Sequence, residues 1–231
     1  GPINKLSRQI PFFKNDNIIL SWGRGLIVDE KNKVIGKIKF HSLKQSILKG
    51  DSCDNNLNKL MRVNFIVPSS TVVIRKSSLL SIGGFKQPHY APYADYPTYL
   101  ELALKGKFFY IDDLLGYWRR HNLQVTSKLY ADFVLARANL IEDFCKSLDD
   151  DFKKKINLNE KFMLAKSYWL KGRYYLIKDQ SKKARREFLT SIIFGNFEIK
   201  IKSIFGIVFS FLKFIDLELF AKIFQRFKNL F

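Results

Sequence analysis

The segment Val67-Pro68-Ser69-Ser70-Thr71-Val72-Val73-Ile74-Arg75 contains a β-branched run. Thr, Val and Ile in succession favour a strand, which we predict over residues 70–75. Residues from Lys76 predict a short helix that ends at Gly83-Gly84, because glycine readily takes the backbone conformation found just after a helix. This succession of strand and helix indicates a mixed α/β domain.

Strands are also predicted upstream of this segment. Residues 17–22 form an apolar, β-branched run, and residues 25–38 predict a hairpin around the polar turn 29–33. Residues 41–62 mix polar and apolar side chains with helical spacing. The chain before the quoted segment therefore contributes strands first and a helical stretch second.

Downstream, residues 95–104 place apolar side chains on one helical stripe, and Gly106 ends the predicted helix. Residues 108–111 and 115–118 predict two more strands, separated by Asp112-Asp113. Beyond residue 126 the strand signals stop. Amphipathic helical patterns then cover residues 127–148, 159–178, 180–194 and 197–231. We therefore predict an α/β part over residues 1–126 and an all-helical part over residues 127–231.

The charge of the chain indicates anionic partners. The 231 residues carry 40 Lys and Arg against 21 Asp and Glu, a net charge of +19. Residues 153–231 hold 18 of the basic and six of the acidic residues. No zinc-finger or RNP-like motif accompanies this charge, so we expect no nucleic-acid partner. Only Cys53 and Cys145 are present, which excludes a disulfide scaffold and a cysteine-based zinc site.

Neither a secretion signal nor a membrane-spanning stretch is recognisable. The N-terminal residues have no apolar core of the kind that signal peptides need, and no uninterrupted apolar run reaches about 18 residues. The two cysteines fit a reducing compartment. We therefore expect a cytoplasmic protein, with peripheral attachment to the inner face of the membrane as the alternative.

Four motifs occur in a fixed order in the first half. They are residues 67–75, Ile82-Gly83-Gly84-Phe85, Ala94-Asp95-Tyr96 at the start of a helix that ends in Leu104-Lys105-Gly106, and Gly116-Tyr117-Trp118-Arg119-Arg120-His121. Together they resemble the acceptor-side half of family 2 glycosyltransferases of the GT-A fold. The resemblance covers residues 17–126. It implies an inverting enzyme that moves a sugar from a nucleotide-sugar donor to a glycan or lipid-linked acceptor, as in bacterial surface-polysaccharide synthesis.

The same resemblance implies that a nucleotide-binding half precedes residue 1. In the family, this half ends in a DxD motif whose carboxylates hold Mn²⁺ or Mg²⁺ on the donor diphosphate. We therefore expect the present chain to be a C-terminal fragment that is inactive alone. The acidic triplet Asp149-Asp150-Asp151 lies between predicted helices, so we interpret it as a solvated or capping cluster.

By the resemblance, Asp95 is the catalytic base that takes the proton of the acceptor hydroxyl. The acid that precedes it in the family is Ala94 here, which departs from the family's acceptor site. The alternative is that Asp95 only caps the helix that it begins. Among the neighbouring motifs, Phe85, Tyr93 and Trp118 offer flat faces to a sugar ring, or belong to the core.

The strand end around residues 119–121 is the predicted position of the leaving diphosphate. The resemblance makes His121 a metal ligand, and Arg119 a group that neutralises the diphosphate. Strand alternation places Arg119 and His121 on one face and Arg120 on the other. The alternative is a solvent-exposed basic strand end.

Two patterns stand out in the helical part. Residues 161–188 contain Trp169, Gly172, Tyr175, Ala184 and Phe188, which resemble one tetratricopeptide-like helix pair. Residues 197–231 combine many Phe and Ile with scattered Lys and Arg. Such a segment either lies on an anionic membrane surface or packs as a helix pair within a bundle. A non-enzymatic basic adaptor, binding a partner or a membrane, is therefore the alternative function.

Overall fold

The computed structural model describes residues 2–38, 53–121 and 128–211. Within them the chain forms two compact units. The first contains the described residues up to Lys128 together with Asp150–Leu158, and the second contains Leu129–Asp149 and the described residues from Asn159 onward. The first unit is mixed α/β, with a sheet of four strands, whereas the elements of the second are helices.

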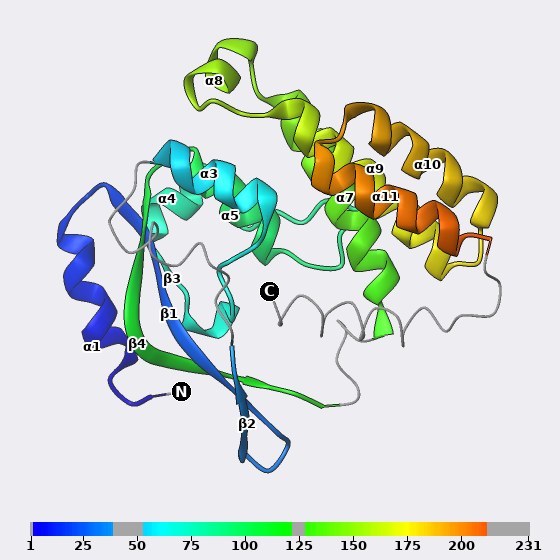
Figure 1. The fold of residues 1–231 in the computed structure, drawn as a ribbon. Helices are drawn as coiled ribbons and strands as arrows, with labels where there is room; N and C mark the ends of the chain where they lie inside the picture. The colour runs from blue at the N-terminus through cyan, green and yellow to red at the C-terminus, as the bar shows by residue number, and fades with distance from the viewer. Residues whose placement is uncertain (1, 39–52, 122–127, 212–231) are drawn as a thin grey trace. The chain divides into compact units, whose positions relative to one another are not determined.

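The sheet is built around the long strand β1 (Ile18–Val28). One edge of β1 pairs in parallel with β4 (Lys107–Arg119), which runs along nearly its whole length. The other edge pairs antiparallel with β3 (Val73–Ile74) and with the hairpin strand β2 (Val34–Lys37). Figure 1 shows β1 and β4 side by side. The mixed pairing makes β1 the central strand of the first unit.

Two of the strand predictions were wrong in their boundaries. Residues 18–28 form one strand, not a strand followed by a separate hairpin arm, and 107–119 form one strand, not two. In the second case the register passes from Gly23 opposite Ile111 to Arg24 opposite Leu114, so Asp112-Asp113 bulge out of the pairing. A bulge lets two acidic residues stay within a continuous strand.

Ion pairs accompany this bulge. Arg24 contacts Asp112 at 3.4 Å and Arg8 contacts Asp113 at 3.3 Å, and all four side chains are about half exposed. The segment predicted as a strand over residues 70–75 also differs from expectation. It begins as a 3-10 turn, η2 (Ser69–Thr71), and only Val73–Ile74 pair with β1.

Besides η2, six helices belong to the described residues of the first unit. They are α1 (Lys5–Gln9), the 3-10 helix η1 (Ile10–Lys14), α3 (Cys53–Arg62), α4 (Lys76–Ser81), α5 (Asp95–Ala103) and α8 (Asp150–Lys155). The helices predicted from Lys76 and over residues 95–104 are confirmed. Gly83 and Gly84 follow α4 with φ of 78° and 85°, as a glycine stop requires. Of the helical stretch predicted over residues 41–62, residues 41–52 lie outside the described part.

Both faces of β1 are covered. On one face Trp22 is 1% exposed and packs against Phe65 and Tyr110, with ring centroids 5.7 and 5.4 Å away. On the other face the buried amide of Gln9 donates hydrogen bonds to the Ser21 hydroxyl at 3.0 Å and to the carbonyl of Thr71 at 2.9 Å. The first helix is thereby joined to the sheet by buried hydrogen bonds as well as by apolar packing.

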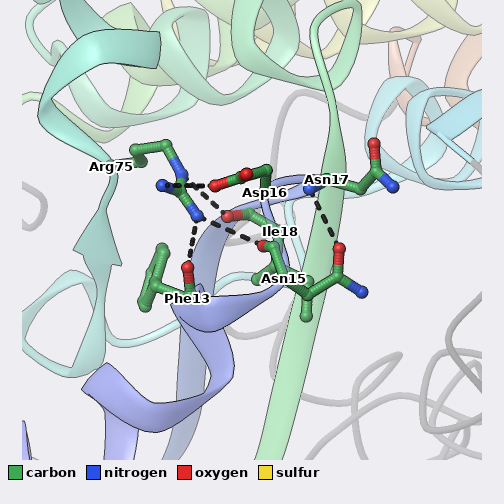
Figure 2. A network of polar contacts seen from close by, with 6 residues as sticks. All are labelled: Phe13, Asn15, Asp16, Asn17, Ile18 and Arg75. Atoms are coloured by element: carbon green, nitrogen blue, oxygen red, sulfur yellow. Dashed lines mark hydrogen bonds and ion pairs between the residues drawn. The ribbon is translucent and has the colours of Figure 1, made fainter.

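Arg75 holds the chain where it leads into β1. Its guanidinium donates to the carbonyl oxygens of Phe13 (2.6 Å), Asn15 (3.2 Å) and Ile18 (3.3 Å), and it contacts the carboxylate of Asp16 at 3.3 Å. Figure 2 shows these contacts converging on one side chain. The arginine that ends the segment 67–75 therefore acts as a structural clamp, because its planar group satisfies several carbonyls at once.

A pair of glycines brings the turn at residues 68–71 close to the sheet. Gly25 on β1 is the register partner of Gly116 on β4. A Cβ atom at Gly25 would lie 2.6 Å from the Pro68 ring, and one at Gly116 would lie 2.9 Å from the Ser70 hydroxyl. The turn can occupy this position only because neither strand has a side chain there.

We expect Gly25→Ala to lower the free energy of unfolding of the first unit by about 1–3 kcal/mol, since the new methyl group must displace the Pro68 ring. The urea-denaturation midpoint measures this change. Gly36→Ala is the matched control on β2, where the nearest atom to the new Cβ is 3.6 Å away. Equal midpoints for the two variants would contradict the close packing of the turn.

The second unit consists of α7 (Tyr130–Ser147), α9 (Glu160–Ile177), α10 (Ser181–Phe194) and α11 (Phe197–Phe209). These helices confirm the predicted helical pattern up to residue 211; residues 212–231 lie outside the described part. Across residues 2–38, 53–121 and 128–211, the structure contains no helix with the length and apolar character that crossing a bilayer requires.

Phe188 is the central side chain of this helical unit. It is fully buried, and a Cβ at Gly172 of α9 or at Gly206 of α11 would come within 2.6 and 2.4 Å of its ring. The hydroxyl of Ser191 donates to the Ala165 carbonyl at 2.8 Å, and Ser203 donates to Ser191 at 3.0 Å. Small residues on both neighbouring helices therefore allow α10 to pack closely against each.

Replacing Phe188 with alanine should lower the free energy of unfolding of the second unit by about 3–5 kcal/mol, because the cavity would lie between three helices. Far-UV circular dichroism during urea titration measures this loss. Leu189→Ala, at an adjacent position that is 56% exposed, should change stability by no more than about 0.5 kcal/mol. A similar effect of both substitutions would argue against the central position of Phe188.

Candidate functional site

Asp95 is the first residue of α5, and Ala94 occupies the N-cap position. Its half-buried carboxylate accepts two hydrogen bonds: from the Ser69 hydroxyl to Oδ2 at 3.0 Å, and from the backbone N–H of Tyr96 to Oδ1 at 2.8 Å. An acid in the first turn also interacts favourably with the helix dipole. The carboxylate therefore supports the helix start and is held by a side chain from a distant turn.

Ser69 links Asp95 to a second titratable group. Tyr99, one helical turn after Asp95, is 2% exposed. Burial raises the pKa of the Tyr99 phenol, the negative charge of Asp95 raises it further, and a hydrogen bond with Ser69 opposes these two effects. Around Asp95 the site thus contains a hydroxyl and a phenol that keeps its proton at neutral pH.

The turn that carries Ser69 also contacts the end of β4. The Ser70 hydroxyl donates to the backbone carbonyl of Tyr117 at 3.0 Å. The ammonium group of Lys5 donates to the carbonyl of Ser70 at 2.9 Å, and burial lowers the pKa of Lys5. The turn, the start of α5 and the end of β4 are therefore joined by hydrogen bonds.

Phe85 lies in the loop that follows α4. Its side chain is 64% exposed, and the backbone N–H of Lys86 donates to the Thr98 hydroxyl of α5 at 2.9 Å. Tyr93 is half buried, with its ring centroid 6.4 Å from that of Tyr96. The loop that carries Phe85 is thereby joined to α5, and the Phe85 side chain is exposed to solvent.

Trp118 and Arg120 form a stacked pair. The Arg120 guanidinium lies 4.9 Å from the centre of the half-buried Trp118 ring, as expected for side chains two residues apart on a strand. The backbone N–H of Arg120 donates to the carbonyl of Val28 at 2.8 Å, which continues the pairing with β1. A sugar stacked on this face of Trp118 would compete with Arg120.

Arg119 contacts the hairpin turn between β1 and β2. Its guanidinium donates to the carbonyl of Glu30 at 2.9 Å and to the side-chain oxygen of Asn32 at 2.8 Å. Both acceptors lie in the tight turn that joins the strands. To bind a diphosphate, Arg119 would have to give up these hydrogen bonds. His121 follows β4 and is exposed.

The described residues assemble no group of three or more His, Cys, Asp and Glu side chains suited to a metal ion. If His121 is a ligand of the Mn²⁺ or Mg²⁺ implied by the resemblance, the other ligands would come from outside the described residues, as the resemblance itself implies for the DxD carboxylates. Asp150 and Asp151 begin α8 and pair with Lys153 and Lys154 at 3.3 and 3.5 Å. As expected for a solvated cluster, these two carboxylates are 85% and 97% exposed.

The sequence matches no model of a known protein family, and no curated protein is significantly similar to it. A functional site around Asp95 is therefore inferred from the geometry of the contacts seen in the structure. That geometry adds Ser69 and Tyr99 to the residues predicted from the sequence. Ser69 belongs to the segment 67–75, but the carboxylate that it contacts lies 26 residues further along the chain, so local sequence pattern does not predict the contact. Tyr99 belongs to the helical stripe predicted over residues 95–104.

We predict that Asp95→Asn lowers the pKa of Tyr99, because the charge of Asp95 contributes to its elevation. The pKa should stay above its ordinary value of about 10, since burial remains. Tyrosinate absorbance during pH titration measures the change, and the difference between wild type and Tyr99→Phe isolates the absorbance of Tyr99 from that of the other tyrosines. Identical titrations of wild type and Asp95→Asn would contradict the proximity of the two groups.

The raised pKa also has a consequence for stability. A folded chain that keeps the Tyr99 proton to higher pH than the unfolded chain binds more protons in alkali. The stability associated with this phenol is therefore complete below about pH 10 and decreases as the pH rises above it. The urea-denaturation midpoint should fall in this range less steeply in Tyr99→Phe than in wild type.

Proposed function

We propose that the first unit is the acceptor-side part of an inverting glycosyltransferase of the family 2, GT-A type. The observation that carries the proposal is the contact of Ser69 with Asp95 at 3.0 Å, next to the contact of Ser70 with the end of β4. Through these contacts the motif at residues 67–75 is joined to the Asp95 carboxylate and to the backbone of the motif at residues 116–121. Convergence of motifs far apart in sequence is typical of a functional site.

In this proposal Asp95 is the general base. An acceptor hydroxyl attacks the anomeric carbon of the donor sugar and transfers its proton to the Asp95 carboxylate. The bond from that carbon to the diphosphate breaks, and its electron pair leaves with the diphosphate. Ser69 holds one carboxylate oxygen in place, and the half-buried side chain keeps access to an acceptor. Because Ala94 stands where the family has a second carboxylate, the acceptor would be bound without a carboxylate at that position.

The proposed substrates are a nucleotide-sugar donor and a glycan or lipid-linked acceptor, handled in the cytoplasm. In the family the donor and its divalent metal bind to a half that would precede this chain. The described residues contain no acidic cluster that could replace that half. We therefore expect no micromolar binding when the chain alone is titrated with UDP-, GDP- or dTDP-sugars and Mn²⁺. Saturable, metal-dependent binding would contradict this division of the enzyme.

Transfer assays on the protein expressed from its complete reading frame test the role of Asp95. Asp95→Asn should lower kcat by about 10²–10⁴-fold while donor binding is retained, because the proton acceptor is removed. The control Glu101→Gln removes a negative charge from the same helix at a position that does not contact Ser69, and it should leave kcat unchanged. Full turnover by Asp95→Asn would show that this carboxylate serves only the start of the helix.

The second unit supports a second candidate function, a basic adaptor module. Gly172, Ala184 and Phe188 have the spacing of a tetratricopeptide helix pair, and Gly206 follows Gly172 after 34 residues, the length of that repeat. Both glycines pack on Phe188. We propose that α11 packs on α10 as the first helix of a following repeat would, and that the unit serves as a docking element attached to the enzyme.

A further inference from the structure

Helix α11 presents an apolar stripe to solvent. Its five members recur at intervals of three, four or one residue along the helix, and they are 37–80% exposed: Phe197, Ile201, Ile204, Phe205 and Val208. The face that packs onto α10 contains different residues, among them the buried Ser203 and Gly206. The stripe is therefore not needed for the contact between α10 and α11.

The stripe continues around the turn into α10. Ile193 and Phe194, the last residues of α10, are 73% and 47% exposed, and Leu189 one turn earlier is 56% exposed. Only Gly195-Asn196 separate them from Phe197, and Asn196 caps α11 by accepting a hydrogen bond from the Ile199 N–H at 3.0 Å. The capped turn presents these side chains on an ordered corner. We name the stripe and this corner the apolar face.

Positive charge adjoins the apolar face. On α10, Lys182 and Arg186 are exposed and lie seven and three residues before Leu189, on the same side of the helix. On α11, Lys200 is exposed, while Glu198 is engaged by Lys202. Residues 160–211 contain eleven Lys and Arg against four acidic residues. A partner of the apolar face would therefore meet a positive field.

We propose that the apolar face and its flanking cations form a docking surface for an anionic membrane. Exposed apolar residues gathered in one patch indicate a binding surface, whereas single ones do not. The boundary between headgroups and acyl chains accepts Phe, Ile and Leu, and anionic headgroups attract the neighbouring Lys and Arg. The charge selects an anionic lipid surface over a neutral apolar partner. This inference does not depend on the proposed enzymatic activity.

Co-sedimentation of the full chain with lipid vesicles tests the proposal. We expect binding to vesicles of equal parts phosphatidylcholine and phosphatidylglycerol, and little binding to phosphatidylcholine alone. Ile204→Glu and Phe205→Glu should each weaken binding at least about tenfold, because an acidic group replaces an inserted apolar one. Leu80→Glu is the matched control: Leu80 is 63% exposed, on α4 of the first unit, and its substitution should leave binding unchanged.

A second pair of variants separates charge from insertion. Lys200→Gln and Arg186→Gln should each weaken binding to the anionic vesicles about fivefold and leave the weak binding to neutral vesicles unaltered. Far-UV circular dichroism should give the same denaturation midpoint for all variants, since the substituted residues are exposed.

Three results would overturn the proposal. The first is equal binding to neutral and anionic vesicles, or binding to neither. The second is an equal effect of Ile204→Glu and Leu80→Glu on vesicle binding. The third is a lower denaturation midpoint for Ile204→Glu with unchanged vesicle binding, which would mean that another part of the chain, or a second copy of it, covers the stripe.

Discussion

Close approach of a turn to two paired glycines is the contact on which the first unit depends. Gly25 and Gly116 face each other across β1 and β4, and the turn at residues 68–71 lies against them. A Cβ atom at Gly25 would meet the Pro68 ring, and one at Gly116 would meet the Ser70 hydroxyl. Ser69, which lies between these two residues, donates its hydroxyl to Asp95. A packing constraint inside the sheet thus positions the turn that contacts the candidate catalytic base.

The second unit uses small residues in a similar way. Gly172 and Gly206 leave room for the Phe188 ring between α9 and α11, so three helices share one large apolar side chain. Interiors packed to crystal-like density tolerate neither a gap nor an added methyl group at such a position. The inner face of α11 makes this contact, and within the described part of the chain the apolar residues of its outer face are exposed.

The strand boundary that the sequence predicted incorrectly has a physical cause. Asp112-Asp113 predicted a break between two strands, since acidic residues are unfavourable in a strand. In the folded chain they bulge out of the pairing, and Arg24 and Arg8 neutralise them. Arg119 donates to the hairpin turn, a contact that strand alternation alone does not reveal, and its role at a diphosphate stays a prediction.

Local patterns in the sequence predicted the mixed α/β first part, the helices that follow, the glycine stop after α4 and the uneven charge. Periodicity and turn chemistry act over a few residues, so one chain displays them directly. The contact of Ser69 with Asp95, the pairing of Gly25 with Gly116 and the exposed stripe of α11 became visible in the folded chain. These contacts depend on strand register and on close approach between distant segments, which local patterns do not specify.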